Sequence, residues 1–176
     1  RIVRVGQRPS GWVGKVWAMQ HGLRAAGTPE FLWFTDADIA HAPGMLRALV
    51  TKAVAEQRDL VSVMVMLSCR RGIERLLIPA FVYFFQQLYP FAHVADRRRR
   101  AAAAAGGSML VRRKALELAG GLEKIRGALI DDCALARLLK LRDGANPGRR
   151  FGRLWLGLSE DARSLRAYGG LKPVWD

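Results

Sequence analysis

Two aspartates, Asp36 and Asp38, stand one residue apart directly after the apolar run 31–34, in the stretch TDADIAH. On an extended segment residues i and i+2 point the same way, so both carboxylates could face one ligand. Carboxylate oxygens suit Mg²⁺ or Mn²⁺ that carries a substrate phosphate. The alternative is a solvated turn in which Asp38 caps the next helix. Asp36 and Asp38 are therefore candidate cation ligands, and His41 is a third candidate only because it follows them.

A second pair of acids, Asp131 and Asp132, begins the clearest helical pattern, LIDDCALARLLKLRDG. Acids are favoured at a helix N-cap and in its first turn by free backbone N–H groups and the helix dipole. Such donors lower the pKa of a carboxylate and weaken it as a base. This accounts for Asp131 as the cap and leaves Asp132 as a candidate general base.

Lys15 and a glycine pair are further candidates. Lys15 follows Gly14 in SGWVGKVW, but Val16 stands where a phosphate-binding P-loop has Ser or Thr, and the first glycine has the wrong offset. Both a lysine near a phosphate site and a solvated lysine fit this pattern. The Gly106–Gly107 pair could let the backbone approach a ligand closely, and a plain turn is the alternative.

The elements around these residues indicate an α/β sheet with crossover helices. Helical spacing predicts helices over 14–26 and 43–57, and the apolar runs 31–34 and 60–67 predict strands. Ligands of such sheets gather at the carboxyl ends of strands, which is where Asp36 falls. The rest of the chain predicts helices at 101–105, 114–118 and 131–143 and strands at 108–113 and 154–159.

Residues 76–95 contain no formal charge. About 20 apolar residues are needed to span a bilayer, but Pro79 and Pro90 argue against a clean span. Six aromatic residues followed by the arginine run 97–100 favour a helix lying in the membrane interface, with its basic flank meeting anionic headgroups. An ordinary core helix is the alternative.

The amino-acid composition limits the number of domains and the classes of partner. The 176 residues are 51% hydrophobic, enough for one core, so the chain is one domain or most of one. Its net charge of +14 favours anionic partners: nucleic acid, acidic headgroups or phosphorylated substrates. The two cysteines are far apart without CxxC spacing, which argues against a disulfide scaffold or thiolate zinc site and fits a reducing cytosol.

Four motifs in order resemble the second half of the GT-A domain of family 2 glycosyltransferases, an inverting group. They are GK…A…G (positions 14, 15, 18 and 22), FTDADI, GGSMLVRR and IDDCALARLLK. The stretches GWVGKVWA and ERLLIPAFVYFFQQLYPF are most similar to the hopene-associated glycosyltransferases of bacteria, which are membrane proteins. The resemblance covers nearly all of residues 1–176. It implies the C-terminal part of a GT-A domain: a partial α/β mixed sheet with flanking helices and an amphipathic interfacial helix.

The resemblance also implies roles for single residues. Asp36 and Asp38 match the D-x-D that holds the nucleotide and its Mg²⁺ or Mn²⁺, Lys15 lies where a Gly-Lys helix approaches the donor, and Asp132 matches the general base of an "ED" pair. Arg166 resembles the arginine of the QxxRW motif of processive members, but it lacks the Gln and Trp, which puts processivity in doubt. The implied acceptor-binding residues are Gly107, Ser108, Asp131 and Arg166.

The expected function is that of an inverting glycosyltransferase at the cytoplasmic face of the bacterial inner membrane. It would move a sugar from a nucleotide-diphosphate donor to a hydroxyl of a hopanoid or other lipid, with no nucleic-acid partner. The family's first strands should precede Arg1 and membrane helices should follow, so we expect a fragment that is inactive alone. Two alternatives stay open: an aspartyl phosphatase of the haloacid dehalogenase type, and a basic non-enzymatic module that binds anionic lipid or nucleic acid.

Overall fold

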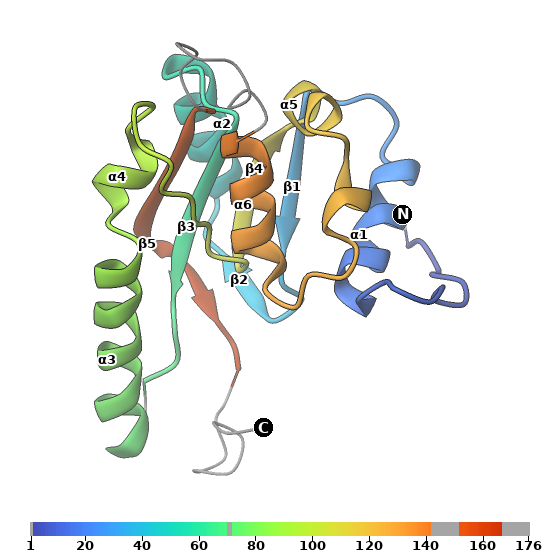
Figure 1. The fold of residues 1–176 in the computed structure, drawn as a ribbon. Coiled ribbons are helices and arrows are strands. Elements are labelled where there is room, and N and C mark those ends of the chain that lie inside the picture. Colours follow the sequence, from blue (N-terminus) through green and yellow to red (C-terminus); the bar gives the residue numbers. More distant parts are fainter. Residues whose placement is uncertain (1, 70–71, 142–151, 167–176) are drawn as a thin grey trace.

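Five strands form one mixed sheet in residues 2–69, 72–141 and 152–166, the parts of the chain that the computed structural model describes (Figure 1). The α/β class predicted from the sequence is confirmed. In chain order the elements are α1 (Gly14–Ala25), β1 (Phe31–Thr35), β2 (Ile39–His41), α2 (Met45–Ala55), β3 (Leu60–Met66), α3 (Gly72–Leu88), α4 (Phe91–Ala95), β4 (Ser108–Arg112), α5 (Arg113–Leu118), the 3-10 helix η1 (Leu122–Ile125), α6 (Asp131–Leu141) and β5 (Leu154–Ser164).

The strands are ordered β1-β4-β3-β5-β2 across the sheet. β4 is antiparallel to both β1 and β3, so β1 and β3 run parallel to each other on either side of it. The chain passes from β1 to β3 through β2 and α2, which forms the predicted crossover. β5 is parallel to β3 and β2 closes the edge antiparallel to β5. The carboxyl ends of β1, β3 and β5 therefore meet at one edge.

Both faces of the sheet are covered, and the residues alternate between them. Val61, Val63 and Val65 of β3 pack with α2 on one face, while Leu60 packs on the other. Helices α1 and α6 and the 3-10 helix η1 contribute to that second core. Figure 1 shows α6 in front of the sheet and α2 behind it. Burial on both sides explains why β3 is an unbroken apolar run.

The five alanines at 101–105 do not form the predicted helix. Ala103 and Ala104 are buried in the core, and the backbone of Ala105 is bonded twice to the Ser62 hydroxyl, through its N–H at 2.9 Å and its carbonyl at 3.0 Å. Small side chains let this backbone lie against the sheet. Tertiary contacts have therefore overridden the helix propensity of alanine.

The uncharged stretch 76–95 forms two helices, because α3 ends at Leu88 and α4 begins after Pro90. Only Glu74 of α3 is buried, so α3 is a peripheral helix rather than a core helix. Figure 1 shows it along one side of the sheet, extending past the edge where the parallel strands end. Its large exposed apolar side chains are 53–70% exposed: Leu76, Phe81, Tyr83, Phe84 and Leu88. Within the described residues, no helix has both the length and the apolar character to cross a membrane.

Candidate active site

Sheet register brings distant motifs to one place. Thr35, the last residue of β1, lies opposite Ser108, the first residue of β4. Asp36 leaves the sheet where Gly107 enters it, and the Thr35 hydroxyl donates a hydrogen bond to the Gly107 carbonyl at 2.9 Å. The D-x-D segment and the glycine pair are thus neighbours, although they are about 70 residues apart in the chain.

Asp36 and Asp38 lie in a turn between β1 and β2, not on an extended segment. The Ile39 N–H donates to the Asp36 carbonyl at 3.4 Å. The alternation argument for their common direction is therefore wrong. Both aspartates nevertheless line the same cavity, because the turn folds over the edge of the sheet.

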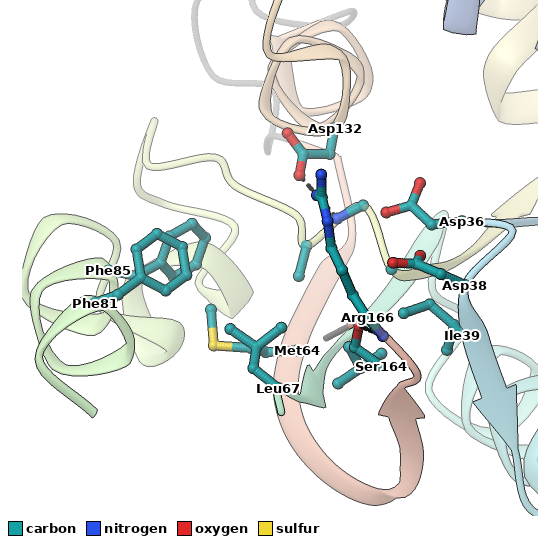
Figure 2. Close-up of a pocket in the computed structure, with 14 residues that line it drawn as sticks. Asp36, Asp38, Ile39, Met64, Leu67, Phe81, Phe85, Asp132, Ser164 and Arg166 are labelled. Carbon is teal, nitrogen blue, oxygen red and sulfur yellow. Dashed lines mark hydrogen bonds between the residues drawn. The ribbon is translucent and has the colours of Figure 1, made fainter. Parts of the chain in front are cut away.

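One cavity of about 320 Å³ is lined by Asp36, Asp38 and Asp132 together. Figure 2 shows these acids on one side and the α3 rings of Phe81 and Phe85 on the other. The acidic side also includes the glycine pair and Arg166. The apolar side consists of Met64, Leu67, Phe81 and Phe85, while Ile39 and Val65 line the cavity beside Gly107. The cavity therefore joins a charged half to an apolar half.

Asp132, in the first turn of α6, accepts hydrogen bonds from two backbone amides. Its Oδ2 accepts a hydrogen bond from the Gly106 N–H at 2.8 Å, and its Oδ1 accepts one from the Cys133 N–H at 2.7 Å. A Cβ atom at Gly106 would lie 3.1 Å from Asp132 Oδ2 and 3.2 Å from Lys15 Nζ. Gly106 thus touches the candidate base, a role that the sequence did not reveal although it marked the loop.

Lys15 links the two acidic motifs. Its ammonium lies 2.8 Å from Asp36 Oδ1 and 3.3 Å from Asp131 Oδ1. Burial works to lower the pKa of Lys15, but its hydrogen bond to Asp36 and the charge of Asp131 outweigh burial and raise that pKa. Lys15 lines a second cavity of about 400 Å³, which shares Asp36 and Gly106 with the first.

Asp131 does not cap α6 as predicted, and it is Asp132 whose two carboxylate oxygens accept hydrogen bonds from backbone N–H groups, contrary to the expectation from the sequence. Asp131 is the first residue of the helix, and the residue before it, Ile130, is at the cap position. The Ile130 carbonyl accepts a hydrogen bond of 3.1 Å from the Ala134 N–H. The Asp131 side chain is buried and turned to Lys15, outside the acidic cavity. Burial raises its pKa, although Lys15 works in the opposite direction. Among the described residues, its Oδ2 has no hydrogen-bond partner.

Two predicted site residues lie elsewhere. Ser108 is buried in β4, where its hydroxyl accepts a hydrogen bond from the Trp33 indole at 2.9 Å. His41 is bonded to Thr35 at 2.9 Å and lines a different cavity beside Glu160 and Asp161. Neither residue lines the acidic cavity. No cluster of three His, Cys, Asp or Glu side chains suited to a metal occurs in the part of the chain that the structure describes.

Arg166 follows the end of β5 and lines the acidic cavity. Figure 2 shows its side chain running across the cavity toward Asp132. Predicted from a partial motif, it joins Gly107 at this site. The acidic cavity thus contains a cationic side chain near its carboxylates.

A mixed α/β sheet whose D-x-D turn and helix-borne carboxylate face one cavity is the arrangement expected of a glycosyltransferase. The family model Glycosyl transferase family 21 matches residues 2–146, so the chain belongs to this family. The matching model is that of family 21, and it does not test the resemblance of the motifs to family 2. A search of curated proteins found no match. Membership of this family favours glycosyl transfer over the aspartyl phosphatase and the non-enzymatic basic module.

Proposed function

We propose that this chain transfers a sugar from a nucleotide-diphosphate donor to a hydroxyl of a lipid acceptor, with inversion at the anomeric carbon. Family membership supports glycosyl transfer. The observation that carries the finer proposal is the single cavity lined by Asp36, Asp38 and Asp132. Leaving-group stabilisation and proton removal must occur on opposite sides of one sugar, and these acids provide both within a sugar-sized space.

Asp36 and Asp38 belong to the donor side. Mg²⁺ is commonly held by one or two carboxylates together with substrate phosphates, so a pair of aspartates fits a cation that is shared with a diphosphate. When bound there, Mg²⁺ or Mn²⁺ would neutralise the charge that develops on the leaving diphosphate. Arg166, whose side chain runs across the same cavity, adds a positive charge to the site.

Asp132 is the proposed general base. It would take the proton from the acceptor hydroxyl as the hydroxyl oxygen attacks the anomeric carbon from the face opposite the diphosphate. The new bond forms on that opposite face while the bond to the leaving phosphate oxygen breaks, which inverts the configuration. The amides of Gly106 and Cys133 fix the carboxylate, and a base that is already oriented loses less entropy in the reaction.

The apolar half of the cavity supports a lipid acceptor. Met64, Leu67, Phe81 and Phe85 face the acids across the cavity. A hydroxyl at the end of an apolar molecule could reach Asp132 while the rest of the molecule lies against these side chains. A hopanoid is one lipid of this kind, and the sequence resemblance is what suggests it.

The outer face of α3 supports contact with a membrane surface. A helix that is apolar on all sides is normally buried, but α3 carries large exposed apolar residues that do not line the cavity: Leu76, Tyr83, Phe84 and Leu88. An interfacial helix buries such residues among lipid headgroups, and basic residues strengthen its contact with anionic lipid. The proposal therefore puts the enzyme at the cytoplasmic face of the bacterial inner membrane, in keeping with its net charge of +14.

Asp132→Asn in the full-length enzyme tests the reaction. General-base catalysis contributes about 10²–10⁴-fold, so we expect kcat to fall by at least about 100-fold while donor affinity stays near the wild-type value. Asp161→Asn, which alters an exposed acid outside this cavity, should leave both unchanged. Transfer of radiolabelled sugar measures kcat, and calorimetry measures donor binding. Wild-type turnover in Asp132→Asn would remove Asp132 from this role.

A further inference from the structure

We propose that Lys15 is an internal counter-ion of the D-x-D turn that keeps divalent cations out of this site while no donor is bound. This inference rests on the proposed function, because it concerns the same acids. Lys15 would then have a role in the donor-free enzyme in addition to any contact with the donor.

The geometry places the ammonium where a cation would be held. Lys15 Nζ lies 2.8 Å from Asp36 Oδ1, so this oxygen already has a positive partner. The same ammonium lies 3.3 Å from Asp131 Oδ1 and thereby ties the turn after β1 to the start of α6. A divalent cation that used Asp36 would have to displace the ammonium or bind against its charge.

The protein offers a cation at Asp36 too few other ligands to outweigh the repulsion from the Lys15 ammonium. The described residues contain no cluster of three potential ligand side chains, so a cation at Asp36 and Asp38 must take its other ligands from water or a phosphate. Water alone leaves the cation facing a lysine. A diphosphate changes this balance because it offers oxygen ligands to the cation and an anionic partner to the ammonium.

The surroundings of Lys15 allow that exchange of partners. The lysine lines the second cavity, and Asp36 and Gly106 belong to both cavities. An anion bound beside Asp36 is therefore next to the ammonium. A lysine side chain ordinarily carries a positive charge at neutral pH, so repulsion of a cation persists under ordinary conditions.

The test is Mn²⁺ binding to the purified donor-free protein, measured by electron paramagnetic resonance of unbound Mn²⁺. A unit charge within a few ångströms of a divalent ion should weaken binding about tenfold even in a water-like dielectric. Lys15→Met should therefore bind Mn²⁺ about tenfold more tightly than the wild type, and Lys15→Gln should behave alike if the methionine variant folds poorly. Lys52→Met is the matched control, because it removes the same charge from a distant α2 pair with Glu56.

The double variant Lys15→Met with Asp38→Asn tests where the Mn²⁺ binds. Adding Asp38→Asn should abolish the tighter Mn²⁺ binding of Lys15→Met. Equal Mn²⁺ affinity in wild type and both neutral Lys15 variants would overturn the counter-ion role. A gain that survives Asp38→Asn would overturn it as well, because the ion would lie elsewhere. Neither result touches the Asp132→Asn transfer assay. Conversely, failure of that assay together with the Mn²⁺ gain would refute the reaction and leave the counter-ion role standing.

Discussion

Gly106→Ala should slow sugar transfer without unfolding the protein. The new Cβ would lie 3.1 Å from Asp132 Oδ2 and 3.2 Å from Lys15 Nζ, inside ordinary contact distance of both charged atoms. Asp132 cannot simply withdraw, because its Oδ2 accepts a hydrogen bond from the N–H of Gly106 itself at 2.8 Å. The added methyl group therefore acts directly on the position of the proposed base.

The size of the effect follows from these distances. Restoring normal contact requires a shift of a few tenths of an ångström at the Asp132 carboxylate. A misplacement of about 1 Å can cost about 100-fold in rate, so we expect kcat to fall about five- to tenfold, or about 1 kcal/mol in the barrier. Gly106 is not among the described residues with positive φ, so alanine fits its backbone. Such glycine-to-alanine changes tend to stabilise by reducing the entropy of the unfolded chain, which offsets the new contact.

The assay compares kcat for radiolabelled sugar transfer at saturating donor with urea unfolding of the same protein. Gly22→Ala is the control, because it adds a methyl group in α1 with nothing within 4 Å. That variant should keep wild-type kcat and gain up to about 1 kcal/mol of stability. If Gly106→Ala turned over at the wild-type rate, the Gly106 loop would not determine where Asp132 sits. A large loss of stability would instead make Gly106 a folding residue.

Two further variants test features away from the acids. Burial lowers the pKa of Lys140 from 10.5 to about 8, although the charge of Asp96 opposes this shift. Between about pH 8 and pH 10.5 the folded protein therefore binds fewer protons than the unfolded protein. The free energy of unfolding should rise with pH over this range. Lys140→Met should remove about 1 kcal/mol per pH unit of that rise in urea unfolding between pH 8 and 10, and unchanged slopes would contradict it. Phe84→Asp on the outer face of α3 should weaken cosedimentation with anionic vesicles about tenfold through lost apolar burial. Val54→Asp on α2, which is also exposed, should not, and equal losses would rule out α3 as the membrane contact.

Most strands and helices could be predicted because their apolar patterns are local. The predicted strand 60–67 and the structural β3, Leu60–Met66, agree closely, since a two-sided buried strand is one apolar run. β2 and the second half of β5 could not be foreseen. β2 has only three half-buried residues, and its pairing with the polar end of β5 gives no periodic signal. The prediction of a helix at 101–105 was wrong because the Ser62 hydroxyl, which is distant in sequence, forms hydrogen bonds with the backbone of Ala105.

The candidate site was predictable by residue type and not by geometry. Carboxylates at Asp36, Asp38 and Asp132 stood out because acids follow an apolar strand and begin a helix. The ion pair of Lys15 with Asp36 depends on how α1 packs beside β1, which spacing along the chain does not record. The contact of Gly106 with Asp132 requires both the β1–β4 register and the placement of α6. Long-range packing decides such contacts, so they became visible only in the fold.

Under the proposed function, the charges around the cavity favour the binding of a cation and a donor together. Four aspartates, at 36, 38, 131 and 132, gather near two cations, Lys15 and Arg166. Lys15 offsets part of this excess by pairing with Asp36 and Asp131, which lie in different segments of the chain. A diphosphate adds further negative charge and competes for the same lysine. If Lys15 paired with the phosphate instead, Asp36 would lose its positive partner. A divalent cation would then be attracted by both the Asp36 carboxylate and the diphosphate, which together bind it more strongly than either one alone.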